Sequence, residues 1–125
     1  MLKKFSLAAA VILACASTAA FAAPASVADT AKGKVLVDSH GMTLYTFAKD
    51  SAGKSVCSGQ CLANWPAFTA SATAKDADGY TVITRDDGAK QWAYKGQALY
   101  TWVKDSKAGD ITGDGVGGNW NLARP

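Results

Sequence analysis

Apolar and polar residues alternate along several short stretches of the chain, which is the pattern of β-strands with one buried face. The first two stretches cover residues 35–38 and 42–48. Between them stand Ser39, His40 and Gly41, a sequence that suits a turn. This part of the chain therefore predicts a β-hairpin.

A second part of the chain has the same form. Residues 91–94 and 98–103 alternate in the same way, and residues 95–96 form the turn between them. One more short alternating stretch, residues 80–84, ends at the Asp-Asp-Gly turn of residues 86–88. We predict strands over these stretches as well.

The two hairpins belong to an internal repeat. Residues 41–65 align without a gap to residues 96–120, an offset of 55, and nine of the 25 paired residues are identical. The similarity is highest where residues 44–51 match residues 99–106. Such self-similarity predicts two related structural units.

Aromatic residues recur on the same face of the repeated strand. Side chains alternate between the two faces of a strand, so Tyr45 and Phe47 share one face, and Tyr100 and Trp102 share the matching face of the second unit. Because small domains need large side chains to fill their cores, we expect most aromatic residues to be buried. An exposed row of them would instead stack on sugars or cover a partner protein.

An aspartate follows the repeated strand in each unit. Asp50 and Asp105 lie just beyond the strand ends, where a carboxylate accepts backbone N–H bonds and fixes a turn. We expect both to be structural. The loops that follow end in Asn-Trp at Trp65 and Trp120, and we expect each loop to deliver its tryptophan to the core.

The first 22 residues have the order of a secretory signal: Lys3 and Lys4, an apolar run over residues 5–16, and small residues that end in Ala22. This interpretation predicts export to the periplasm or beyond the cell. A rival interpretation takes residues 12–15 as a lipobox, which would make Cys15 a lipidated first residue and anchor the protein in the envelope.

Composition supports a small β-rich domain. Removal of 22 from 125 residues leaves 103, enough for one domain, with 11 basic residues after loss of two lysines against 10 acids. This near-neutral balance gives no reason to expect nucleic acid as a partner. All ten acids are Asp, and there are 12 glycines, which favours turns over long helices.

We therefore predict a mainly β, small single domain built from two pseudo-symmetric β-hairpin repeats with long loops and little helix. Its expected organisation is a flexible segment over residues 23–33, a first repeat over 34–68, a linker over 69–79, and a second repeat over 80–123 of a domain ending at 125.

The chain resembles a family of bacterial secreted repeats, which includes predicted lipoproteins and is marked by the motif Y-x-[FWY]-x-x-D. The resemblance covers about residues 34–123 and implies an envelope location, an unknown function and no established catalytic residues. The motif occurs twice, as Tyr45, Phe47 and Asp50 and as Tyr100, Trp102 and Asp105. A C-x-G-x-C-x-x-x-W-P element at residues 57–66 follows the first copy, and a glycine-rich segment at residues 109–120 follows the second.

Two cysteines remain after the signal sequence. Cys57 and Cys61 stand four residues apart in a chain expected to enter an oxidising compartment, which predicts a disulfide across the turn of residues 58–60. The alternative is a thiol/disulfide redox factor. Such enzymes use C-x-x-C at a helix N-terminus, which neither the spacing nor the β pattern supports.

Two further candidates for chemistry carry weaker signals. Asp110 and Asp114 mimic the opening of a calcium loop, but Asn121 stands where the loop needs a bidentate Glu. We expect a glycine-rich turn there, with calcium binding as the alternative. His40 is the only histidine and lacks companions for a zinc site, so we expect an exposed turn residue.

The sequence leads to one main hypothesis: an exported envelope module without catalytic activity, which binds an envelope protein or a glycan or serves as a structural element. The redox factor and the calcium-binding protein are the alternatives. No cofactor is expected, and a membrane is a partner only if Cys15 is lipidated. The oligomeric state stays open.

Overall fold

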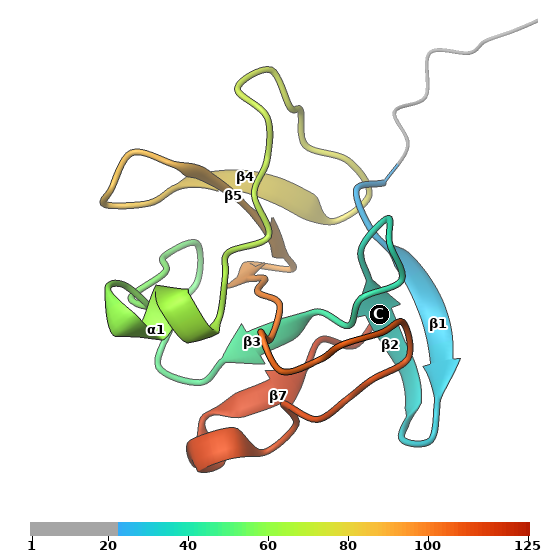
Figure 1. The fold of residues 1–125 in the computed structure, drawn as a ribbon. Helices are drawn as coiled ribbons and strands as arrows, with labels where there is room; N and C mark the ends of the chain where they lie inside the picture. The colour runs from blue at the N-terminus through green and yellow to red at the C-terminus, as the bar shows by residue number, and fades with distance from the viewer. Residues whose placement is uncertain (1–22) are drawn as a thin grey trace, which may run out of the picture.

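Short antiparallel strands form the framework of the computed structural model, which describes residues 23–125 (Figure 1). The predicted signal sequence and Cys15 lie outside these residues. The expected mainly β fold with little helix is confirmed by seven strands, one short α-helix and one 3-10 turn: β1 Ser26–Thr30, β2 Gly33–Val37, β3 Tyr45–Phe47, α1 Gln60–Asn64, β4 Tyr80–Thr84, β5 Lys90–Tyr94, β6 Gln97–Ala98, η1 Val116–Gly118 and β7 Trp120–Leu122.

The first strand lies in the segment expected to be flexible, residues 23–33. β1 pairs with β2 over its full length, from Ser26 opposite Val37 to Thr30 opposite Gly33. Strict alternation is missing from this strand because most of its residues are exposed, including Val27 at 49%. The first unit therefore begins earlier than the alternating pattern suggests.

The two units share a meander, which has three strands in the second unit and two strands with an isolated bridge in the first. In the second unit β5 pairs with both β4 and β6. In the first unit β2 pairs with β1 and makes a bridge from Val37 to Thr43. That bridge lies where Ala93 pairs with Ala98 in the second unit, and the turn of the first hairpin is one residue longer.

The last strand of each unit is exchanged with the other unit. β7, from the second unit, pairs with β3 of the first, so Leu122 lies opposite Tyr45. The corresponding residue of the first unit, Ala67, bridges to Tyr100 of the second. Figure 1 shows β3 and β7 side by side, with the β1–β2 and β4–β5 hairpins on different sides of this pair. Each unit therefore completes the sheet of the other.

A pair of tyrosines lies at the centre of the contact between the two units. The backbone N–H of Tyr45 donates to the carbonyl of Tyr100 at 2.8 Å, and the N–H of Tyr100 donates to the carbonyl of Tyr45 at 3.0 Å. These residues occupy the same position in the two repeats. An approximate two-fold axis therefore passes between them.

Alternation along the central strands separates two apolar clusters. Tyr45 and Tyr100 belong to a central cluster that also contains Trp65 and Trp120. Leu44 and Leu99, their chain neighbours, face a second cluster. In residues 23–125, no helix is long and apolar enough to cross a membrane.

Candidate functional site

Four aromatic rings form a continuous stack through the central cluster. Trp65 and Trp120 lie parallel at its centre, with ring centroids 3.8 Å apart and planes 4° apart. Phe47 stacks on Trp120 at 4.3 Å, and Trp102 stacks on Trp65 at 4.0 Å. Each outer ring therefore rests on a tryptophan of the other unit. This column of rings stabilises the exchanged arrangement.

The two motif tyrosines contact the column by their ring edges and bond to the opposite motif aspartates. The Tyr45 hydroxyl donates to Asp105 Oδ2 at 2.6 Å, and the Tyr100 hydroxyl donates to Asp50 Oδ2 at 2.6 Å. Each aspartate also accepts a backbone N–H through Oδ1, Asp50 from Val56 and Asp105 from Thr112. The repeated Y-x-[FWY]-x-x-D residues thus couple the units to each other.

Burial and these hydrogen bonds shift the pKa values of Tyr45, Tyr100 and Asp50. Burial, followed by the bond to Asp50, raises the pKa of Tyr100 from 10.0 to about 12. The pKa of Tyr45 is raised for the same reasons, with burial first and Asp105 second. Burial also raises the pKa of Asp50, although the Tyr100 hydroxyl acts in the opposite direction. The tyrosines are thereby held in the protonated form, in which they serve as donors.

The expected disulfide is present. Cys57 and Cys61 are bonded, with Cα atoms 5.3 Å apart. The bridge closes the turn that leads into α1, and the N–H of Trp65 donates to the carbonyl of Cys61 at 2.8 Å at the end of that helix. Cys57 is only 1% exposed, which shields its sulfur from a partner thiol, whereas Cys61 is partly exposed. The disulfide therefore helps to hold Trp65 in its position at the end of α1.

In the second unit a glycine loop takes the place of this bridge. An added Cβ at Gly113 would lie 2.8 Å from the ring of Trp65 and 2.9 Å from that of Tyr45, so only glycine fits between the rings. The Gly113 N–H also donates to the Tyr45 hydroxyl at 3.1 Å. The glycine loop of the second unit therefore packs directly against Trp65 and Tyr45 of the first unit.

Asp110 and Asp114, the two candidate calcium ligands, make hydrogen bonds and ion pairs within the protein. The Asp110 carboxylate accepts the backbone N–H of Ser106 and both the ammonium and the backbone N–H of Lys107, and these contacts lower the pKa of this partly buried aspartate to about 2. Asp114 pairs with Lys32 at 2.9 Å. No group of three or more His, Cys, Asp or Glu side chains suited to a metal ion occurs within residues 23–125.

His40 is exposed in the turn of the first hairpin. Its backbone N–H donates to Asp38 Oδ1 at 2.8 Å, and the N–H of Met42 donates to the same oxygen at 3.0 Å. Asp38 therefore fixes this turn.

A buried arginine, which the sequence did not mark, ties the second hairpin to the cystine loop. Arg85 Nη1 donates to Ser55 Oγ at 2.6 Å and to Gln91 Oε1 at 2.8 Å, and Nη2 donates to the carbonyl of Cys57. Ser55 Oγ in turn bonds the Tyr100 hydroxyl at 2.5 Å. Because the partners of Arg85 lie up to 30 positions away, no local sequence pattern announces this network.

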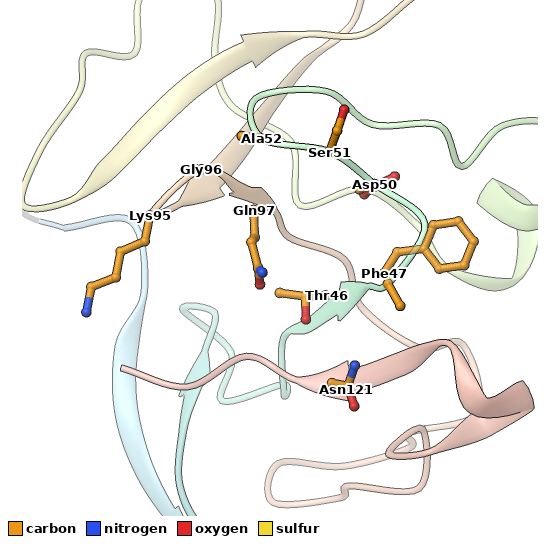
Figure 2. A pocket seen from close by; sticks show the side chains of 10 residues that line it. Thr46, Phe47, Asp50, Ser51, Ala52, Lys95, Gly96, Gln97 and Asn121 are labelled. Carbon is orange, nitrogen blue, oxygen red and sulfur yellow. The ribbon is translucent and has the colours of Figure 1, made fainter.

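A polar hollow of about 240 Å³ lies beside the central strands. It is lined by β3, β7, the loop after β3 and the turn between β5 and β6 (Figure 2). Thr46 and Asn121 stand opposite each other on β3 and β7, and Figure 2 shows the Gln97 side chain pointing toward Thr46. The Phe47 ring points away from the hollow. A ligand in this hollow would therefore not stack on the Phe47 ring.

Sequence reasoning missed this hollow. Nothing in the sequence marks Thr46, and Asn121 stands out only as the residue in place of a calcium-loop Glu. Three separate segments build the hollow, and only the exchange of β7 into the first unit brings Asn121 next to Thr46. No spacing in the sequence encodes that exchange.

A known family matches both repeats of the chain. A family model described as a secreted repeat of unknown function (Lipoprotein_15) matches residues 26–69 and 81–124. The two matches are 44 residues each, 88 of the 125 residues, and they start 55 residues apart, as the internal repeat does. No curated protein and no solved structure matches the chain.

Proposed function

Because the chain belongs to the family of secreted repeats of unknown function, we propose that it is an exported, non-enzymatic module that binds an envelope component at the hollow between β3, β7 and the β5–β6 turn. The exchanged strands and the aromatic column supply a rigid support for this surface. Rigid elements hold binding side chains more accurately than loops do.

One observation carries this proposal. Thr46, Gln97 and Asn121 face the hollow, and within residues 23–125 their side chains make no hydrogen bond. Gln97 and Asn121 are exposed and Thr46 is partly buried, so their polar groups are open to the surroundings of the protein. Polar groups that the fold does not use are available to a ligand.

Retention of envelope material by the immobilised mature protein tests this role. We expect wild type to retain a component that the Gln97→Met/Asn121→Ala variant loses. Thr101→Ala is the matched control, because Thr101 occupies the position of Thr46 in the other unit. Equal retention by all three proteins, or no retention by wild type, would contradict the proposal.

We also propose that the mature protein is released after cleavage at Ala22 and is not anchored by a lipid at Cys15. The signal pattern that ends at Ala22 supports cleavage there and release into the periplasm or medium. Lipidation at Cys15 would instead leave an anchored protein with a longer N-terminal segment. The mass of the mature protein separates the two, since only cleavage after Ala22 gives an unmodified chain that begins at Ala23.

A further inference from the structure

We infer that the hollow beside Thr46 and Asn121 takes one residue of a neutral glycan. This inference rests on the binding role proposed above and names the ligand class. It follows from the hydrogen-bonding groups, the charge, the paired strand edges and the comparison of the two repeats.

The hydrogen-bonding groups suit sugar hydroxyls. The Asn121 and Gln97 amides each offer donors and an acceptor, and the Thr46 hydroxyl offers both. A sugar hydroxyl is also donor and acceptor at once, so adjacent hydroxyls can bond two of these side chains together. The hollow of about 240 Å³ is smaller than the roughly 300–1,000 Å³ sites that enclose drug-sized ligands, which fits one unit of a longer chain.

The charges around the hollow favour a neutral ligand. Lys95 and Asp50 are the charged lining residues, and they carry opposite signs. Both Asp50 oxygens already accept hydrogen bonds, one from the Val56 N–H and one from the Tyr100 hydroxyl. The Lys95 ammonium lies 5.2 Å from the centroid of the Tyr94 ring. Neither charge is thus arranged as a site for an ionic ligand.

A peptide would find little backbone support here. β3 is paired with β7 on one edge, and Tyr45 bonds Tyr100 on the other. An extended peptide gains affinity by adding a strand to a free edge, and β3 offers none. Recognition in the hollow therefore depends on side chains, as it does for a saccharide.

The two repeats differ in the groups that line the hollow. At the offset of 55, Gln97 corresponds to Met42 and Asn121 to Pro66. The residues that hold the fold, by contrast, recur in both units, as Tyr45 and Tyr100 do. On the other side of the axis, an added Cβ at Gly41 would lie 2.9 Å from Ala108 Cβ, against 3.7 Å from Ala52 Cβ at the equivalent Gly96, so the covering loop lies closer on that side. The fold thus does not require the side-chain amides of Gln97 and Asn121.

Titration of ¹⁵N-labelled mature protein with chitotetraose, cellotetraose and maltotetraose tests the inference. We expect at least one of them to shift the side-chain amide signals of Gln97 and Asn121 and the backbone signal of Thr46. Affinity should be weak, with a Kd on the order of millimolar, because the hollow is open and small. Gln97→Met and Asn121→Ala should each weaken binding about 3- to 10-fold, the effect of one lost hydrogen bond, and Thr101→Ala should bind as wild type.

Three results would overturn the inference. They are no shift with any of the tetrasaccharides, shifts confined to residues away from the hollow, and equal affinity of wild type and both hollow variants. If a neutral tetrapeptide or polygalacturonate shifts these signals and the sugars do not, the ligand class is refuted and the binding role survives. If the immobilised protein retains no envelope component at all, the binding role itself fails.

Discussion

The hydroxyl of Tyr45 donates a 2.6 Å hydrogen bond to Asp105, a residue of the other repeat. The equivalent bond joins Tyr100 to Asp50, so the motif that recurs along the chain is completed only between its two copies. A tyrosine and an aspartate five positions apart thus join the two units, while the second oxygen of each aspartate holds the loop that follows it. The motif is a device for joining two units.

Replacement of Tyr45 by Phe tests this relationship. The change keeps the ring that packs against Trp65 and removes the hydroxyl, so Asp105 loses a buried donor. We expect a loss of about 2 kcal/mol in the free energy of unfolding, measured by urea denaturation, because bonds to charged groups contribute about 1.5–3 kcal/mol.

Tyr94→Phe is the control for that measurement. Tyr94 is only partly buried, and its hydroxyl makes no hydrogen bond within residues 23–125. We expect a change within about 0.5 kcal/mol, as for substitutions away from such contacts. Equal effects of the two replacements would show that the bond to Asp105 adds nothing to stability.

The sequence predicts which residues are equivalent but not how they meet. The offset of 55 pairs Tyr45 with Tyr100 and Trp65 with Trp120, and the structure places both pairs against the same axis. Strand exchange leaves the local pattern unchanged, since a strand alternates in the same way whichever unit it joins. For this reason the hairpins were predictable, whereas the hollow beside Asn121 was not.

Alkaline pH is expected to destabilise the protein through its tyrosines. The pKa of Tyr100 is about 12 in the folded protein against 10.0 ordinarily, so above pH 10 the unfolded chain releases a proton that the folded protein keeps. Stability is therefore fully present below pH 10 and is lost as pH rises toward 12. Urea midpoints measured across this range give the slope.

Phenolate absorbance provides the independent readout. Of the four tyrosines, Tyr45 and Tyr100 should ionise together with the loss of near-UV circular dichroism. Complete ionisation of all four near pH 10 in a protein that keeps its native spectrum would contradict the burial of these two.

Removal of the disulfide should weaken the fold without abolishing binding. Replacement of Cys57 and Cys61 by Ser opens a short loop, which in the chain-entropy model costs about 2 kcal/mol of stability. Urea denaturation measures the loss, and retention of envelope material under native conditions should match wild type. A variant that is as stable as wild type but inactive would favour the redox alternative.

An Ellman titration supplies the control for that variant. The native mature protein should present no free thiol, because both cysteines are bonded. Two reactive thiols in the folded protein would contradict the bridge.

Separation of the two units is the most direct test of the strand exchange. Residues 23–79 lack β7, which pairs with β3 and whose Trp120 stacks on Phe47. A unit without these partners leaves β3 unpaired on both edges and the column broken, so we expect it to be unfolded as a monomer by near-UV circular dichroism. Mixing it with residues 80–125 should restore the native spectrum as a one-to-one complex in analytical ultracentrifugation. A folded monomer of residues 23–79 would mean that the first repeat closes its own sheet, and the exchanged pairing of Leu122 with Tyr45 would not be needed for folding.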